Sequence, residues 1–263
     1  MEESQLKDTG ERIIPGDPAF NYSFQHHLVA YEWARGFCSG KSVLDIGCGE
    51  GYGCNLLAQN ASRVVGLDNS KEAVNHAQNH YRLPNLVFYH GDAYHLPFPD
   101  ESFEVVLSFQ VIEHLKRPER HLEEAVRVLT RGGILLLSTP NKVQFGVDFH
   151  LKIPFHYREF IPEEIQSLLK NYFKEVKMYG LWGSERIKVL HDLDGQAILR
   201  LVKLDPLGLR RLIPRKVYEL VYPFMWKKSR VRSYKQHKDL IDSITTKDFY
   251  LKPLSGSPQD LSC

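Results

Sequence analysis

One short segment, residues 43–53 (VLDIGCGEGYG), alternates carboxylates and glycines. An apolar run leads into it and a helix-like run follows, so it predicts a turn between a strand and a helix. Glycines allow the backbone to turn sharply and to approach a ligand closely. The spacing differs from the dinucleotide pattern G-x-G-x-x-G, because Tyr52 and Cys54 stand where a third glycine would. A pyrophosphate ligand is therefore disfavoured.

The charges of this turn favour a different ligand. Asp45 and Glu50 would repel a phosphate, but they suit a molecule that carries an ammonium and a sulfonium group. S-adenosylmethionine has this pattern of charges. The alternative interpretation, a purely structural loop between strand and helix, is less favoured because two further acidic strand ends follow along the chain.

Asp68 and Asp92 are these two strand ends. Asp68 lies about 20 residues beyond the glycine turn, the separation at which an acidic residue accepts from ribose hydroxyls. Asp92, in the sequence His90-Gly91-Asp92-Ala93, could accept from an adenine amino group. Each could instead cap the helix that follows it, since aspartate is favoured at helix N-termini.

The ordered motifs D-x-G-C-G-x-G, G-D-A and R-G-G resemble those of class I S-adenosylmethionine-dependent methyltransferases over residues 25–182. The sequence I-E-H-L at residues 112–115 is similar to that of the small-molecule enzymes related to ubiquinone and menaquinone biosynthesis. The resemblance implies S-adenosylmethionine as methyl donor, S-adenosylhomocysteine as product, and an acceptor bound above the strand ends. The cofactor residues expected on this basis are Asp45, Gly47, Cys48, Gly49, Gly51, Asp68, Asn69, Asp92, Ala93, Phe109 and Gln110.

A base is needed if the methyl acceptor is a hydroxyl, and histidine has a suitable pKa. His114 follows the fourth strand and is the first candidate, His156 is the second, and a merely packed or surface histidine is the alternative. A metal pair at Glu113 and His114 is disfavoured, because no other histidine stands at ligand spacing. We therefore expect no metal. Residues expected to contact the acceptor are Tyr22, His27, Tyr31, Tyr157 and Arg158.

Alternating apolar and helix-like segments must position these side chains. Candidate strands cover residues 42–46, 63–67, 86–89, 103–108 and 133–138, and candidate helices cover 26–37, 52–59, 71–81, 119–130 and 162–171. This βαβ order predicts an α/β fold with a mostly parallel sheet between helical layers. The resemblance implies a Rossmann-like three-layer sandwich of seven strands, the last antiparallel. Residues 173–181 are the candidate sixth strand and 247–251 the seventh.

Four segments follow from this arrangement: an N-terminal lid (1–24), a cofactor-binding core (25–184), a basic amphipathic helical insertion between strands six and seven (185–242), and the last strand with the tail (243–263). Basic and aromatic residues interleave over 205–232. That stretch could contact an anionic membrane, cover the acceptor, form a dimer contact, or be an ordinary solvated helix. The oligomeric state is left open between monomer and homodimer.

Composition narrows the class of function. A net charge of +2 and a pI near 8.2 do not indicate a nucleic-acid protein. The four cysteines have no metal-ligand or disulfide spacing, and the charged N-terminus has no apolar leader pattern, so a cytoplasmic location, with possible contact to a membrane face, is expected. The expected function is methylation of a small organic acceptor, with a hydroxyl of a sugar, lipid-linked or specialised metabolite favoured. N- or C-methylation and a non-catalytic S-adenosylmethionine-binding module are the alternatives.

Overall fold

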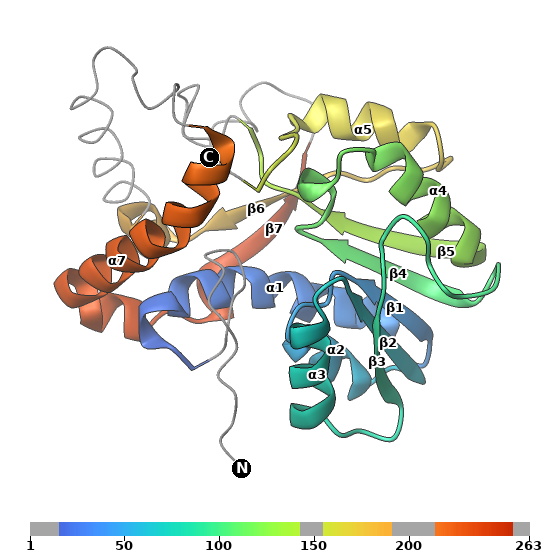
Figure 1. The fold of residues 1–263 in the computed structure, drawn as a ribbon, viewed down its shortest axis with the longest axis horizontal. Helices are drawn as coiled ribbons and strands as arrows, with labels where there is room; N and C mark the ends of the chain where they lie inside the picture. Colours follow the sequence, from blue (N-terminus) through green and yellow to red (C-terminus); the bar gives the residue numbers. More distant parts are fainter. Residues whose placement is uncertain (1–15, 143–154, 191–213, 255–263) are drawn as a thin grey trace. The chain divides into compact units, whose positions relative to one another are not determined.

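The computed structural model describes residues 16–142, 155–190 and 214–254, which belong to two compact units (Figure 1). The first unit contains His27–Lys142 and His156–Val176. The second contains the described parts of Asp8–His26 and Lys177–Cys263, together with Phe155. Except for Tyr22, all the residues predicted to bind cofactor or acceptor belong to the first unit.

A five-stranded parallel sheet forms the centre of the first unit. Its strands are β1 (Ser42–Ile46), β2 (Arg63–Asp68), β3 (Leu86–His90), β4 (Phe103–Phe109) and β5 (Leu129–Ser138). They lie in the order β3-β2-β1-β4-β5, and every neighbouring pair is parallel. The direction of winding reverses between β1 and β4. In open α/β sheets, the crevice beyond the carboxyl ends of the strands at such a point is where ligands bind.

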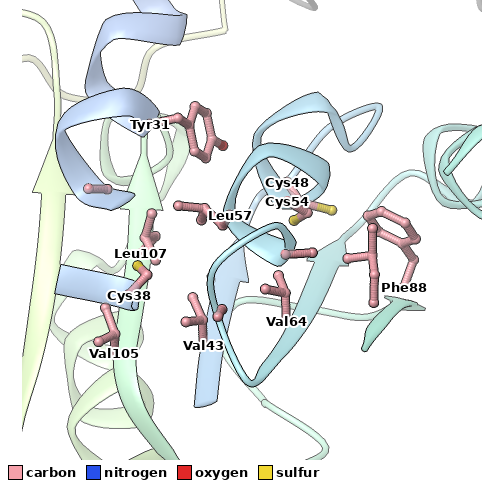
Figure 2. Close-up of a cluster of buried hydrophobic side chains, with 14 of the residues drawn as sticks. Tyr31, Cys38, Val43, Cys48, Cys54, Leu57, Val64, Phe88, Val105 and Leu107 are labelled. Carbon is pink, nitrogen blue, oxygen red and sulfur yellow. The ribbon is translucent and has the colours of Figure 1, made fainter. Parts of the chain in front are cut away.

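Helices cover both faces of this sheet. Val43, Val64 and Val105 face a core shared with α1 (Asn21–Cys38), α2 (Tyr52–Ala58) and α3 (Lys71–His80), and Figure 2 shows part of this cluster. The next residue along each strand, respectively Leu44, Val65 and Val106, faces a second core with α4 (Pro118–Val128). Because successive strand residues point to opposite faces, these largely apolar runs fit a sheet buried on both sides. The predicted strands and helices of this unit are confirmed, but α1 begins five residues before the predicted helix and β5 four residues before the predicted strand.

Local sequence signals explain where the helices begin. The Ser70 hydroxyl accepts a hydrogen bond from the Ala73 amide at 3.2 Å, which caps α3. Both α4 and α5 (Pro162–Lys170) begin with a proline, whose missing N–H costs nothing in the first turn of a helix. These caps fix where each helix leaves its strand end, and hence the loops around the crevice.

The prediction of a single seven-stranded sheet is wrong for its last two strands. Strands β6 (Tyr179–Gly183) and β7 (Phe249–Pro253) pair antiparallel with each other in a separate sheet of the second unit. An antiparallel pair satisfies the facing backbone groups of both strands. The expected sixth strand overlaps β6 only at its last three residues. The expected seventh starts two residues too early, because Thr246–Asp248 forms a 3₁₀ turn, η4.

The second unit also contains the long helix α7 (Arg215–Asp242), which lies between β6 and β7 in sequence, as expected. The Asn21 side chain donates to the carbonyls of Ile241 and Ile244 at 2.7 and 3.1 Å, and the Tyr22 ring lies 6.0 Å from that of Phe249. Within the described ranges, no helix has the length and apolar character needed to cross a bilayer. The predicted segment boundaries at 24, 184 and 242 stay predictions.

Candidate functional site: the strand ends of the parallel sheet

The glycine turn follows β1 and needs its glycines for two physical reasons. Gly47, Gly49 and Gly51 have φ angles of 78°, 58° and 97°, in the left-handed region where other residues are strained. Space is the second reason. A Cβ at Gly47 would lie 2.4 Å from a methyl of Val111, and one at Gly51 would lie 2.8 Å from the Phe88 ring. The turn is thus packed directly against the loop after β4.

Asp45 lies in the core at the end of β1. Its Oδ2 accepts from the Tyr31 hydroxyl at 3.0 Å and from the Cys54 thiol at 3.2 Å, whereas its Oδ1 is buried without a hydrogen-bond partner in the described part of the chain. Burial raises the pKa of this carboxyl to about 7. Burial also raises the pKa of the Cys54 thiol, which fits a hydrogen-bond donor, not a nucleophile.

Glu50 has a structural environment inside the turn. Its carboxylate accepts from the Tyr81 hydroxyl at 3.1 Å and lies 3.3 Å from Nε2 of His76, both contributed by the α3 region. The side chain is almost fully buried. These contacts tie the turn to α3.

Asp68 connects the ends of β1 and β2. Its Oδ2 accepts from the Gly49 amide at 2.9 Å and its Oδ1 accepts from the Ser70 amide at 2.8 Å. Each carboxylate oxygen can accept a further hydrogen bond. The geometry therefore leaves capacity for a ligand diol. The neighbouring Asn69 is exposed at the same strand end, and its carbonyl lies 3.1 Å from Nε2 of His90.

The end of β3 leads to Asp92 and Ala93. Asp92 accepts from the Tyr94 amide at 2.9 Å and is well exposed to solvent. The Ala93 carbonyl lies 3.3 Å from Nδ1 of the buried His121, whose Nε2 lies 2.9 Å from the hydroxyl of Ser108. Burial lowers the pKa of His121, so its ring is neutral and links β3, β4 and α4.

The end of β4 carries Phe109 and Gln110. Gln110 has a φ of 56°, one of two non-glycine residues with positive φ in the described ranges. Its amide donates to the Ser138 carbonyl at 2.9 Å, which holds it to the end of β5. The Phe109 ring packs edge-on against Tyr31 at 5.1 Å. A strained residue fixed by its surroundings marks a candidate site.

A cluster of titratable groups follows, formed by Glu113, His114 and His156. Their candidate ligand atoms lie within 4.8 Å of one another, and the two imidazole rings are 4.8 Å apart. Glu113 is fully buried: Oε2 accepts from the Thr139 hydroxyl at 3.0 Å, and Oε1 has no hydrogen-bond partner in the described ranges. Burial raises the pKa of the Glu113 carboxyl to about 7.

From the sequence, Glu113 was considered only as half of a disfavoured metal pair, although a glutamate inside the apolar run 111–115 was a signal of a functional role. Backbone hydrogen bonds bring His156 to it across 43 positions of sequence: the Glu113 carbonyl accepts from the amides of Tyr157 and Arg158 at 2.7 and 3.3 Å. Nδ1 of His156 lies 3.2 Å from a carboxylate oxygen of Glu159. The cluster therefore combines the loop after β4 with the segment before α5.

Comparison with known proteins identifies the family. The chain is 45% identical, over 66% of its length and 67% of the relative's, to a probable S-adenosylmethionine-dependent methyltransferase of Mycolicibacterium smegmatis. The chain belongs to the S-adenosylmethionine-dependent methyltransferases. A family model described as a methyltransferase domain matches residues 44–137 of this methyltransferase.

Two further likenesses bear on the methyltransferase. It is 36% identical, over 49% of its length and 47% of the relative's, to a fatty-acid O-methyltransferase of Mycolicibacterium smegmatis. A solved structure from Thermotoga maritima, described as a methyltransferase and possible histamine N-methyltransferase, matches with a TM-score of 0.53 at 24% identity. That match covers 63% of this chain and 79% of the other and supports the Rossmann-like fold alone.

The strand ends of the methyltransferase fit its cofactor, S-adenosylmethionine. The orphaned Oδ1 of Asp45 is a buried acceptor at the turn, and the remaining acceptor capacity of Asp68 suits a ribose diol. The close approaches at Gly47 and Gly51 leave no room for a Cβ. The structure brings together the predicted cofactor residues at the carboxyl ends of β1 to β4, and their individual contacts with the cofactor stay predictions.

The residues predicted to contact the acceptor lie in several places. Tyr31 is 5% exposed and donates to Asp45, so the structure places it beneath the glycine turn. His27 lies on the same helix, and burial lowers its pKa to about 4. Tyr157 is exposed, with the Lys116 ammonium 5.0 Å from its ring, and the Arg158 guanidinium lies over Phe160. Their acceptor contacts, and those of Tyr22 in the second unit, stay predictions.

Proposed function

We propose that this methyltransferase methylates a hydroxyl of a small organic acceptor, in a sugar, lipid-linked or specialised metabolite. The observation that carries the proposal is the cluster of Glu113, His114 and His156. Glu113 and His114 follow within one turn of Val111, and the Val111 side chain packs against Gly47 of the cofactor turn. Proton-accepting groups therefore lie close to the cofactor crevice, where a hydroxyl acceptor would need them.

The chemistry assigned to the residues is simple. S-adenosylmethionine supplies an electrophilic methyl group when bound. The acceptor oxygen would form a bond to the methyl carbon as the carbon–sulfur bond breaks, and the electron pair would stay on sulfur. The hydroxyl proton passes to His114, with His156 as the second candidate. Asp68 would hold the ribose and Asp92 the adenine, and the protein would act mainly by alignment.

Two observations favour oxygen and a lipid-like acceptor over nitrogen or carbon. The likeness to a fatty-acid O-methyltransferase covers about half of the chain. The amino-terminal half of α7 exposes an apolar stripe at helical spacing, made of Val217, Leu220, Val221, Phe224 and Met225. A non-catalytic module would not need a proton acceptor beside the crevice at all.

The same stripe supports peripheral contact with a membrane. Lys216, Lys227 and Lys228 are exposed at its borders, so the surface combines apolar anchors with positive charge. This combination fits the interface of an anionic leaflet. Residues 205–213 of the predicted contact lie outside the described ranges.

Methyl transfer to defined acceptors tests the proposal. Purified protein would be incubated with methyl-labelled S-adenosylmethionine and matched long-chain compounds that end in a hydroxyl, a carboxyl, an amine or a thiol, and with a sugar. Transfer to the hydroxyl compound, lost in His114→Gln and retained in His80→Gln on the surface of α3, supports it. Transfer only to the carboxyl, the amine or the thiol refutes it.

A further inference from the structure

The buried cluster of Glu113, His114 and His156 has the composition of a metal site. Two imidazoles and one carboxylate are donors that first-row divalent cations prefer. Sequence spacing showed only two adjacent candidates, and the fold adds His156 from 42 residues beyond His114. Three ligands contributed by two separate segments form a more specific arrangement than an acidic surface patch.

The unpartnered oxygen of Glu113 provides independent support. Oε1 is fully buried and accepts no hydrogen bond from the described residues, whereas Oε2 is held by the Thr139 hydroxyl. A buried carboxylate oxygen without a partner costs free energy. A coordinated cation would satisfy this oxygen and compensate the buried charge.

Glu159 gives His156 the arrangement of an oriented ligand. Its carboxylate lies 3.2 Å from Nδ1 of His156, and a carboxylate only accepts hydrogen bonds, so Nδ1 carries the proton in the neutral ring. In this tautomer Nε2 is the ring atom that carries a lone pair, the form in which a histidine nitrogen binds a cation. Carboxylates hold metal-binding histidines in this way.

The distances are compatible with a shared cation. The three candidate ligand atoms lie within 4.8 Å of one another. Around a tetrahedral cation with bonds of about 2.1 Å, ligand atoms are roughly 3.4 Å apart. Binding therefore requires these donor atoms to move closer together than they lie without a cation.

We propose that Glu113, His114 and His156 bind one divalent transition-metal cation, such as Zn²⁺ or Mn²⁺, beside the cofactor crevice. This inference deepens the proposed function and rests on it. With the cation bound, a coordinated acceptor hydroxyl would have a lowered pKa and would lose its proton to solvent. His114 and His156 would then serve as ligands, and the base role proposed above would apply to the protein without the cation. The cation also orients the acceptor oxygen relative to the cofactor.

Cation binding can be measured without an acceptor. Chelator-treated full-length protein would be titrated with Zn²⁺ and Mn²⁺ by calorimetry and with Co²⁺ by visible absorption. We expect one equivalent to bind with a Kd of roughly 1 µM or below in wild type. We expect binding at least about 100-fold weaker in His156→Gln and in Glu113→Gln, because each variant removes one of three ligands. His80→Gln is the matched control and should bind as wild type does.

S-adenosylhomocysteine binding shows whether each variant is folded, and His114→Gln replaces any variant that fails this check. Equal cation affinity in wild type and the folded variants overturns the inference, as does a wild-type Kd above about 1 mM. If chelator-treated protein without a bound cation still methylates the hydroxyl, the metal proposal is overturned and the proposed function stands. If the protein binds the cation but transfers methyl groups only to amines, the metal site is supported and the proposed hydroxyl acceptor is refuted.

Discussion

At the scale of single residues, Asp45 and Asp68 have different roles, although both lie at strand ends beside the same crevice. Asp45 is enclosed by the Tyr31 hydroxyl and the Cys54 thiol. Asp68 accepts two backbone amides and keeps further acceptor capacity. A buried carboxyl of raised pKa responds to pH, and a carboxyl with spare acceptor sites responds to ligand. The two positions therefore call for different measurements.

We expect Asp68→Ala to weaken S-adenosylhomocysteine binding by about 100-fold or more, since it removes hydrogen bonds to a charged acceptor and loosens the Gly49 amide. Calorimetric titration with S-adenosylmethionine, S-adenosylhomocysteine and NAD measures this. Glu123→Ala, which removes an exposed carboxylate from α4, is the control. An Asp68→Ala affinity within about threefold of wild type would contradict the ribose assignment.

Asp45 predicts a pH dependence of stability. In the unfolded chain this carboxyl ionises near pH 4, and in the folded protein near pH 7. Between these values the unfolded state releases the proton more readily, so raising the pH lowers the free energy of unfolding. Relative to Asp45→Asn, wild type should lose up to about 4 kcal/mol between pH 4 and pH 7. Urea unfolding of both proteins without cofactor measures this difference, and a constant difference contradicts the prediction.

At the scale of elements, the glycine turn shows how close packing and backbone conformation combine. Gly51→Ala has to accommodate a positive φ and a contact of 2.8 Å with Phe88. Gly40→Ala has a similar positive φ, and its Cβ would meet nothing within 4 Å. We expect Gly40→Ala to cost about 1 kcal/mol and Gly51→Ala a further 1–3 kcal/mol or so. Chemical unfolding of both variants tests this, and equal losses would show that the contact relaxes freely.

Helix α7 presents a second prediction at this scale. Leu220 and Phe224 are 81% and 73% exposed on one face of the helix. The double variant Leu220→Ser/Phe224→Ser should co-sediment with phosphatidylglycerol vesicles several-fold less than wild type, because two apolar anchors are lost. Val189→Ser, at another exposed apolar residue, is the control. Equal binding of the wild type to neutral and anionic vesicles would contradict a contribution of the exposed lysines to membrane binding.

At the scale of the whole molecule, the predicted cofactor site belongs to only one of the two units. The glycine turn and the acidic strand ends all belong to the first unit. S-adenosylhomocysteine at 100 times its Kd should raise the free energy of unfolding by about 2.7 kcal/mol, because it binds the folded state alone. Hydrogen exchange should slow most at the ends of β1 and β2. Slowing confined to β6, β7 and α7 would place the cofactor elsewhere.

Much of this organisation was predictable because it depends on neighbouring residues. Glycines at positions 47, 49 and 51 indicate a turn with positive φ angles, and runs such as Val43–Ile46 indicate a buried strand. The parallel direction of the strands follows from βαβ connections between short segments. The edge of the sheet was not predictable in this way, because β6 and β7 lie 65 residues apart in sequence and the choice of partner depends on which backbone groups are satisfied.

The sequence by itself determined the five parallel strands and the acidic residues at the ends of the first three, since these depend on local spacing and residue type, and its resemblance to known motifs indicated the cofactor class. Tertiary structure decided the environments. It buried Asp45 and Glu113 and raised their pKa values, directed Tyr31 into the core, and joined His156 to His114 through the Glu113 carbonyl. Desolvation and contacts between distant segments exist only once the chain is folded, and those two effects define the chemistry of this site.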